Sequence, residues 1–277
     1  PEDRGFDEVY RHGGGGVGQT PDVWDNAYFG GSYFHNGEIV PAEGFCTDVF
    51  IKQARKFIKK QVEAGQPIFA YISTNAPHGP LHCPQKYLDM YPGQSQKIAA
   101  FYGMITNIDD NVGATRKFLE DLGVSDNTLF IFTTDNGTAT GNEVFNAGMR
   151  GKKGSEYEGG HRVPFIAHWP AAGWNRMHQC DILCHAVDVV PTVVGLAGGK
   201  KPQSLKWDGI SIETLLDPQQ DADIGDRILV TDSQRIRDPI KWRKTAVMSQ
   251  QWRLINGEQL FEIKKDPGQE KDVAVDH

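Results

Sequence analysis

The feature that most constrains the fold is a pattern that occurs twice in the sequence. In this pattern an amphipathic helix is followed by a continuous apolar strand. A helical pattern over 47–65, with Thr47 as its expected cap, precedes the apolar run PIFAYIS at 67–73. A second helical pattern over about 95–122 precedes TLFIFTT at 128–134. Strands that are apolar throughout are typical of a parallel sheet covered by helices on both faces. The sequence therefore predicts an α/β fold around a mostly parallel sheet.

The remaining pattern divides the chain into a large domain and a small one. VPFIAHW at 163–169 is a third apolar strand, and 186–199 is a helical pattern with Asp188 near its cap. After Pro202 the chain changes to short alternating segments separated by polar turns, which is typical of a small antiparallel sheet. We therefore predict a large domain over 1–202 and a small subdomain over 203–277.

Composition excludes several classes of protein. With 277 residues, 39% of them hydrophobic, the chain can bury a full core. The net charge of −7 argues against a nucleic-acid partner, and no apolar run is long enough to span a membrane. The four cysteines are too sparse for a disulfide framework, so we expect free thiols. The first forty residues, including HGGGG at 12–16 and YFHNG at 33–37, are interpreted as long loops.

Polar side chains follow two of the apolar strands, at the sheet edge where ligands of open α/β sheets bind. Asp135 and Asn136 follow 128–134 and offer the oxygen ligands that Ca²⁺ or Mg²⁺ prefers, although the same residues fit an ordinary Asx turn. His78 follows 67–73 between two prolines. A stiff loop can hold its imidazole as a proton donor, and the alternative is a surface histidine in a turn.

The loop from Gly151 to Gly160 carries two adjacent lysines. Its Gly-Lys-Lys-Gly-Ser order does not meet the spacing of a nucleotide-binding P-loop. What remains is a lysine fixed in a glycine-flanked loop before an apolar strand. Such a point cation suits a small tetrahedral oxyanion.

The order of these segments resembles the sulfatase family of the alkaline phosphatase superfamily. The resemblance covers nearly the whole chain and rests on six segments, RGFDE (4–8), NAPHGPLHCP (75–84), TTDNGT (133–138), GKKGSEYEGGHRVPFIAHWPA (151–171), HAVDVVPTVVGLAG (185–198) and LINGEQLFEIKKDPGQEKDVA (254–274). It implies an alkaline-phosphatase-like sheet sandwiched by helices and a sulfuric ester hydrolase activity.

Carried over position by position, the resemblance assigns roles to four residues. Asp135 and Asn136 match ligands of the divalent cation, usually Ca²⁺. Lys153 matches the lysine that binds the sulfate oxygens, which makes Lys152 a neighbour without that role. His78 matches the histidine that contacts the sulfate ester and helps to protonate the leaving oxygen. Glu158 falls among residues expected to support the loop.

One family element has no counterpart here. Family members carry a Cys or Ser in a Cys/Ser-x-Pro-x-Arg motif that is oxidised to formylglycine, the nucleophile of the reaction. No cysteine or serine of this sequence is followed by x-Pro-x-Arg. We therefore expect a C-terminal portion of a sulfatase, inactive by itself, whose nucleophile and remaining metal ligands lie upstream.

Two alternative functions stay open at this stage. A phosphodiesterase or phosphonate hydrolase of the same superfamily would share the metal-based design. A non-catalytic member would bind sulfated glycans without cleaving them, with sugar contacts from 12–16 and 33–37, His35 included. The expected ligand is a sulfated small molecule or a sulfated glycan, and the resemblance favours a periplasmic or extracellular location.

Overall fold

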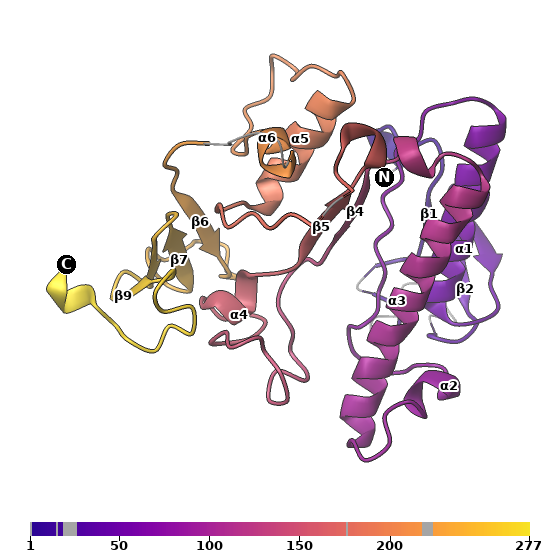
Figure 1. Cartoon of the computed structure of the whole chain (residues 1–277). Coiled ribbons are helices and arrows are strands. Elements are labelled where there is room, and N and C mark those ends of the chain that lie inside the picture. Colours follow the sequence, from indigo (N-terminus) through magenta and orange to yellow (C-terminus); the bar gives the residue numbers. More distant parts are fainter. Residues whose placement is uncertain (1, 15, 19–26, 176, 218–223) are drawn as a thin grey trace. The chain divides into compact units, whose positions relative to one another are not determined.

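The computed structural model of the chain describes residues 2–14, 16–18, 27–175, 177–217 and 224–277 (Figure 1). These residues form two compact units, Pro1–Asp126 and Asn127–His277. Each unit has its own core and is described separately. The predicted division at 202/203 was based on the change in sequence pattern and not on contacts, and it stays a prediction.

The first unit begins with a small antiparallel sheet in the order β1-β2-β3. Its strands are β1 (Tyr10–Arg11), β2 (Ser32–His35) and β3 (Glu38–Pro41), and β2 pairs with β3 along their whole length. Asn36 and Gly37 connect them with φ angles of 51° and 88°. Two positive φ angles in a two-residue Asn-Gly loop are typical of a tight hairpin. The interpretation of 33–37 as a long loop was therefore wrong, and Gly15 of the 12–16 loop lies outside the described residues.

Two long helices and a short one form the rest of the first unit. They are α1 (Cys46–Glu63), α2 (Gln85–Leu88) and α3 (Gln96–Asp121), preceded by the 3₁₀ turn η1 (Glu2–Arg4). Ser95 caps α3 by accepting a hydrogen bond from the amide of Ile98. Thr47 does not cap α1. It is a fully buried residue inside the helix, and Phe45 stands at the cap position.

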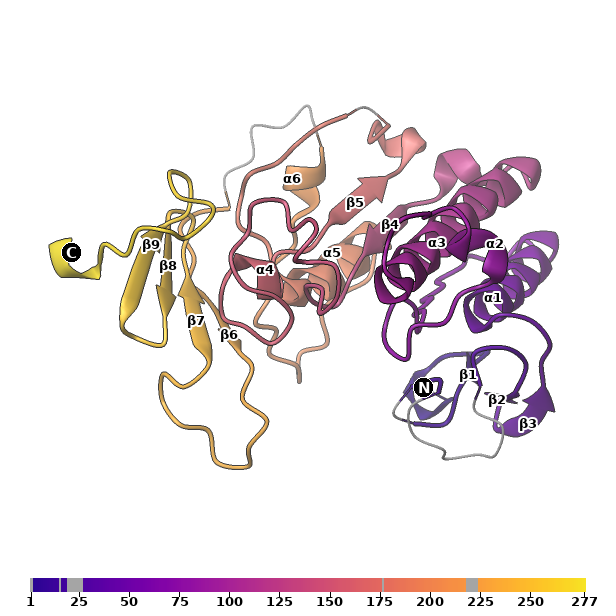
Figure 2. The same ribbon diagram turned by 90° about the horizontal axis from the view of Figure 1, so that it is seen from below.

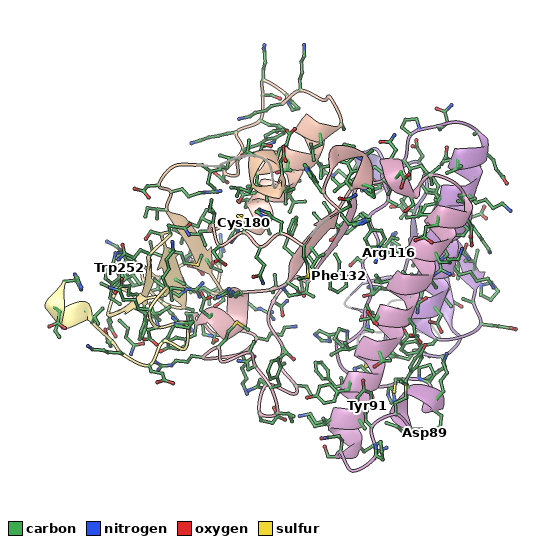
Figure 3. The ribbon with its side chains drawn as sticks, in the orientation of Figure 1. Asp89, Tyr91, Arg116, Phe132, Cys180 and Trp252 are labelled. Carbon is green, nitrogen blue, oxygen red and sulfur yellow. The ribbon has the colours of Figure 1, made fainter. Side chains whose placement is uncertain are left out.

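Polar contacts fix α1 against α3. Asn107 and Asn111 each donate from Nδ2 to the Asp48 carboxylate at 2.7 Å. Arg55 donates to the hydroxyl of Thr115, from Nε at 3.1 Å. Near the start of α3, the Tyr91 hydroxyl lies 2.5 Å from the Thr106 hydroxyl, and Figure 3 labels Tyr91 beside this helix.

The core of the first unit gathers aromatic and aliphatic residues of the hairpin, α1 and α3. Its buried members are Val17, Tyr28, Tyr33, Phe45, Cys46, Val49, Phe50, Ala76 and Met104. Burial raises the pKa of the Cys46 thiol to about 11, so this cysteine is an inert apolar residue at neutral pH. All four cysteines are free, as predicted.

The apolar run 67–73 departs from the prediction. It is not a strand, and within the described residues its backbone forms no hydrogen bond with a neighbouring strand. Phe69 is 61% exposed and Tyr71 is 75% exposed. A strand needs a partner to satisfy its backbone, and this run has none among the described residues. The apolar side chains that the pattern assigned to a sheet interior therefore face solvent.

The second unit opens with the two strands that carry the candidate site. β4 (Phe130–Thr133) pairs antiparallel with β5 (Phe165–His168), and the 3₁₀ turns η2 (Ser125–Asn127) and η3 (Pro170–Ala172) flank them. Both strands fall within the predicted ranges 128–134 and 163–169. Every strand pair among the described residues is antiparallel, so these residues contain no parallel pair.

Short helices lie before and after β5 in the sequence. They are α4 (Glu158–His161), which lies just before it, then η4 (Ala186–Asp188), α5 (Val189–Leu196) and α6 (Glu213–Leu216). Asp188 is fully buried, accepts the amide of His185 and forms a two-point ion pair with Arg227 at 2.9 and 3.0 Å. The predicted helix 186–199 is thus present, with its acidic residue at the N-terminus.

The chain ends in the antiparallel sheet that the sequence predicted. Its strands β6 (Leu229–Asp232), β7 (Thr245–Met248), β8 (Trp252–Ile255) and β9 (Gln259–Glu262) pair in sequence order, and η5 (Ala274–Asp276) follows (Figure 2). Ala246, Ile255 and Phe261 form its buried cluster, with Tyr157 packed against it. No described helix combines the length and the apolar character that a membrane crossing requires.

We predict that the exposed run 67–73 contributes little to the stability of this chain. Replacing Phe69 and Tyr71 with Ser should change the free energy of unfolding by less than about 0.5 kcal/mol. It should also reduce the fluorescence of a dye that binds apolar surface. Met104→Ala is the control, because it empties a fully buried position and should cost about 2–5 kcal/mol. An equal loss in both variants, measured by urea unfolding, would show that 67–73 is buried.

Candidate functional site

The turn after β4 lies against the loop before β5. The amide of Gly137 donates to the carbonyl of Gly160 at 3.1 Å. A Cβ atom at position 137 would lie 1.9 Å from the carbonyl oxygen of Gly159, so only glycine permits this approach. Asp135 is exposed and Asn136 is partly buried, both at the mouth of β4. The predicted metal ligands are thus held at a fixed place by backbone contacts.

Lys153 takes part in the same contact between the turn after β4 and the loop before β5. Its amide donates to the carbonyl of Thr138 at 2.8 Å, which places the lysine beside the segment that begins with Asp135. Ser155 closes the loop, because its hydroxyl accepts the amide of Lys152 at 3.0 Å and its own amide donates to the carbonyl of Lys152. Lys153 is partly buried and Lys152 is exposed. The two lysines therefore differ in their exposure, and the assignment of Lys153 stays a prediction.

The charged side-chain atoms of Asp135 and Lys153 make no contact that holds the fold together among the described residues. In the part of the chain that the structure describes, the Asp135 carboxylate and the Lys153 ammonium form no ion pair or side-chain hydrogen bond. No group of three or more His, Cys, Asp or Glu residues gathers among the described residues. Asp135 and Asn136 offer two oxygen donors, whereas Ca²⁺ takes six to eight. They fit part of a divalent-cation site.

His78 lies in the first unit, on a loop whose shape is set by side chains. Its amide donates to the carbonyl of Asn75, and its carbonyl accepts the Tyr28 hydroxyl at 2.7 Å. Asn75 in turn donates to the same hydroxyl at 2.5 Å. The imidazole is exposed, and its Nδ1 lies 2.9 Å from the carbonyl of Gly79. A carbonyl can only accept, so Nδ1 is the donor in this contact.

His35, the other predicted substrate contact, lies at the end of β2. Its Nε2 is 3.3 Å from the Glu8 carboxylate, and its ring meets the Tyr10 ring edge to face at 5.7 Å. These residues line a pocket of about 310 Å³, and His78 is not among its lining residues. The structure thus places His35 in a site of its own within the first unit.

A buried ion pair anchors the loop that carries Lys153. Glu158 and Arg253 of β8 are 2.6 Å apart and are 7% and 4% exposed. Arg253 also donates to the carbonyl of Glu156 at 3.1 Å. The fully buried Gln269 accepts the amide of Glu158 at 2.7 Å, and its own carbonyl accepts Arg150 at 2.9 Å. The terminal sheet and the segment after it therefore hold both ends of the lysine loop.

Aromatic contacts complete this anchorage. The Arg150 guanidinium lies 4.1 Å from the centre of the Tyr157 ring, and the Tyr157 hydroxyl donates to Gln259 at 2.6 Å. Tyr157 also packs edge to face on the buried Phe261. The supporting role expected for Glu158 is thus explained by its position between the lysine loop and the terminal sheet.

His161 stands beside this ion pair and is held neutral. Burial lowers its pKa from 6.5 to about 4, and the positive charge of Arg253 acts in the same direction. Its buried Nε2 has no hydrogen-bond partner among the described residues. A proton on this ring would place a second cation beside Arg253 in a poorly hydrated place, so acid should disfavour the folded loop.

Sequence reasoning missed Arg253 and Gln269. A signal existed for the first, because Arg253 and Ile255 share the buried face of β8. A charged residue at such a position must meet a partner. Gln269 lies in an irregular segment, where no periodicity marks burial.

The chain matches known proteins over most of its length. The family model described as Sulfatase matches residues 2–199. The uncharacterized sulfatase YdeN of Escherichia coli is 30% identical over 216 residues, which cover 76% of this chain and 37% of that protein. N-acetylgalactosamine-6-sulfatase of Canis lupus familiaris is 34% identical over 177 residues, covering 61% of this chain and 32% of the relative. The chain thus spans about a third of the length of these curated relatives.

A solved structure extends the similarity to the whole chain. The crystal structure of Ps i-CgsB in complex with k-i-k-neocarrahexaose superposes with a TM-score of 0.82 at 27% identity, covering 100% of this chain and 64% of that one. This similarity and the terminal antiparallel sheet confirm the predicted fold class, an alkaline-phosphatase-like α/β fold with a small antiparallel C-terminal part.

We predict that the Glu158–Arg253 pair is a major contributor to the stability of the second unit. Arg253→Ala leaves Glu158 buried without a partner and should lower the free energy of unfolding by about 3–5 kcal/mol. Arg162→Ala is the matched control, because Arg162 is 57% exposed and 3.5 Å from the same carboxylate, and its loss should cost less than about 1 kcal/mol. Urea unfolding followed by tryptophan fluorescence compares them, and equal losses would contradict this assignment.

We predict an acid-sensitive contribution from His161. Its folded pKa of about 4 lies below the ordinary 6.5, so between these values the unfolded chain binds the extra proton. Stability should therefore fall as pH drops from about 6.5 to 4, by on the order of 1–3 kcal/mol. Unfolding of wild type and His161→Asn at several pH values isolates this contribution, because carboxylates titrate alike in both. Parallel stability profiles would mean that His161 titrates normally.

Proposed function

Since the chain belongs to the sulfatase family, we propose that it contributes the sulfate-binding lysine and two metal ligands to a sulfuric ester hydrolase. The observation that carries the proposal is the contact between the two loops of the second unit. Gly137 bonds Gly160 and Lys153 bonds Thr138 through backbone atoms, so the loop segments that carry the lysine and the two oxygen donors lie next to each other. Both sets of side-chain atoms are free of competing partners within the described residues.

Asp135 and Asn136 are proposed to hold the divalent cation, Ca²⁺ or Mg²⁺. A carboxylate and an amide oxygen are hard donors that suit either ion. When bound, such a cation supplies positive charge that stabilises anionic oxygens. The two residues contribute their oxygens from a turn whose backbone is fixed by the Gly137 contact, so their positions are set before a ligand arrives.

Lys153 is proposed to bind the sulfate oxygens. Its backbone is fixed by Thr138, and its ammonium has no partner among the described residues, so the positive charge stays near this loop and is available to an anion. A cation held near the reacting group stabilises a developing negative charge. Lys152 is the more exposed of the two lysines and is not assigned this role.

His78 of the first unit is proposed to contact the sulfate ester and to donate a proton to the leaving alcohol oxygen. Its Nδ1–H bond to the carbonyl of Gly79 fixes the ring orientation and leaves proton transfer to Nε2. The Asn75 and Tyr28 hydrogen bonds hold the loop that carries it.

The nucleophile is proposed to be a formylglycine formed from a Cys or Ser outside the present sequence. The nucleophile is placed outside the present sequence because no cysteine or serine of the chain is followed by x-Pro-x-Arg. By itself the chain should therefore not turn over sulfate esters.

The substrate is proposed to be a sulfated glycan or a sulfated small molecule. The solved relative described as a complex with k-i-k-neocarrahexaose supports the glycan class. A polysaccharide is too large to cross a membrane unaided, so a glycan substrate favours a periplasmic or extracellular location. His35 is proposed as a further sugar contact.

We predict different effects for the two lysines in the complete polypeptide, expressed from its own start codon. Lys153→Ala should lower kcat by about 100- to 1,000-fold on an aryl sulfate, the loss typical of removing one fixed donor to a developing anion. Lys152→Ala should stay within a few-fold of wild type. Equal losses would reject the assignment of Lys153. A higher kcat/KM on the matching phosphate ester in wild type would favour a phosphoryl hydrolase instead.

A further inference from the structure

The pocket of the first unit lies under an unusual row of lysines. Five basic residues occur on α1, and two of them are engaged. Lys59 pairs with Glu63 at 3.7 Å, and Arg55 bonds the Thr115 hydroxyl and the Asn111 carbonyl. The other three, Lys52, Lys56 and Lys60, are exposed and have no ion-pair partner among the described residues.

These three lysines recur every fourth residue, so they share one face of the helix at a spacing of about 6 Å. Like charges at this spacing repel each other and weaken a helix. The chain as a whole carries 36 acidic against 29 basic side chains, so an unpaired positive row is not a consequence of composition. A positive row kept in an acidic protein indicates a binding role for an anion.

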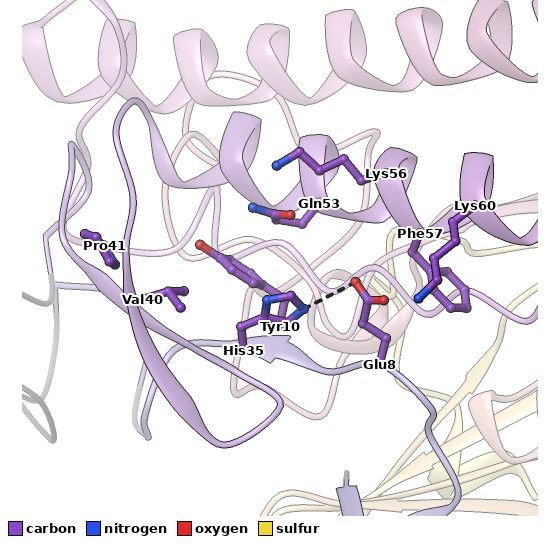
Figure 4. Close-up of a pocket in the computed structure, with 9 residues that line it drawn as sticks. All are labelled: Glu8, Tyr10, His35, Val40, Pro41, Gln53, Lys56, Phe57 and Lys60. Carbon is purple, nitrogen blue, oxygen red and sulfur yellow. Dashed lines mark ion pairs between the residues drawn. The ribbon is translucent and has the colours of Figure 1, made fainter.

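The pocket beside the row has the chemistry of a sugar site. Lys56 and Lys60 line it together with Tyr10, His35 and Phe57, which supply rings, and with Glu8 and Gln53, which offer groups that bind hydroxyls. Figure 4 shows the Gln53 and Lys56 side chains reaching from α1 above the Tyr10 ring, and the Glu8–His35 ion pair below them. Its volume of about 310 Å³ lies at the lower end of the range for small-ligand sites.

The charges of the pocket favour an anionic ligand. Glu8 lies 3.3 Å from Nε2 of His35, and the two lysines of the lining outnumber this single carboxylate, so the pocket keeps an excess of positive charge. A carboxylate inside the pocket disfavours a ligand that is anionic throughout, such as a nucleic acid backbone. A saccharide places hydroxyls at Glu8 and Gln53, a ring face on Tyr10 and an acidic substituent at the lysines.

We propose that this pocket, with the lysine row of α1, is a binding site for an anionic saccharide, and its lining includes none of the residues proposed to cleave the ester. Binding needs neither the metal nor the nucleophile, so it stands without turnover. Its further role, retention of a polymeric substrate, rests on the proposed function.

The test is the binding of a sulfated galactan hexasaccharide to this chain, measured by calorimetry at low salt. The double variant Lys56→Gln with Lys60→Gln should raise Kd by about tenfold or more. The control, Lys59→Gln with Lys117→Gln, removes the same charge from lysines that pair with Glu63 and Asp121, and should change Kd less than twofold. All four lysines are exposed, so neither variant should unfold the chain.

Four outcomes would overturn the proposal, of which three concern the variants and a competing polyanion. These three are unchanged affinity in the Lys56/Lys60 variant, an equal loss in the control variant, and equal affinity for a single-stranded oligonucleotide of matched charge. The desulfated hexasaccharide should bind at least tenfold more weakly, and equal binding would also reject an anion site. Retained binding with no sulfate release by the complete polypeptide would instead reject only the proposed hydrolysis.

Discussion

The contact between Gly137 and the Gly159–Gly160 segment is the constraint from which the second unit's site follows. Two backbones approach so closely there that a single Cβ atom would overlap a carbonyl oxygen. Because the approach is made by main-chain atoms, the neighbouring side chains are not consumed in holding it. The side-chain polar atoms of Asp135, Asn136 and Lys153 thereby have no partner among the described residues, while their backbones are fixed.

A loop held only by such contacts would be weak, because it buries little apolar surface. The second unit resolves this by extending the anchorage to its last fifty residues. Arg253 and Gln269 reach the lysine loop from a strand and from a segment about 100 residues later in the sequence. The small terminal sheet is therefore part of the site's support, and its own buried cluster is continuous with the loop through Tyr157.

Sequence patterns predicted the elements whose cause is local. The two long helices, the strands at 130–133 and 165–168, and the terminal antiparallel sheet follow from periodicity and turn residues. The 67–73 run shows where this reasoning ends, since apolar character marks a strand but its backbone partners must come from elsewhere. The hairpin at Asn36–Gly37 was missed although its turn signal is local, because glycine-rich surroundings were given more weight.

The residues of the candidate site were also predictable from the sequence only where their cause is local. The turn after β4 and the glycine-flanked lysine were accessible from spacing, because strand ends and glycines are local features. The partners of Glu158 were not accessible, since a long-range ion pair leaves only a charged residue on a buried strand face. His35 was predicted as a sugar contact because of its aromatic neighbours. The structure adds that its pocket is also lined by lysines of α1. The sequence around His35 contains no signal that connects it to those lysines.

The two kinds of basic residue are used differently, and this difference is the chemical basis of both proposed sites. Arg55, Arg150, Arg227 and Arg253 all donate to fixed acceptors inside the protein. A planar guanidinium suits this structural use, because it can bond several acceptors at once and never loses its charge. Lys56, Lys60 and Lys153 instead carry compact charges on flexible stems without protein partners among the described residues. The chain commits those arginines to its fold and leaves these lysines without an ion-pair partner among the described residues, so each proposed site includes positive charge that the fold itself does not use.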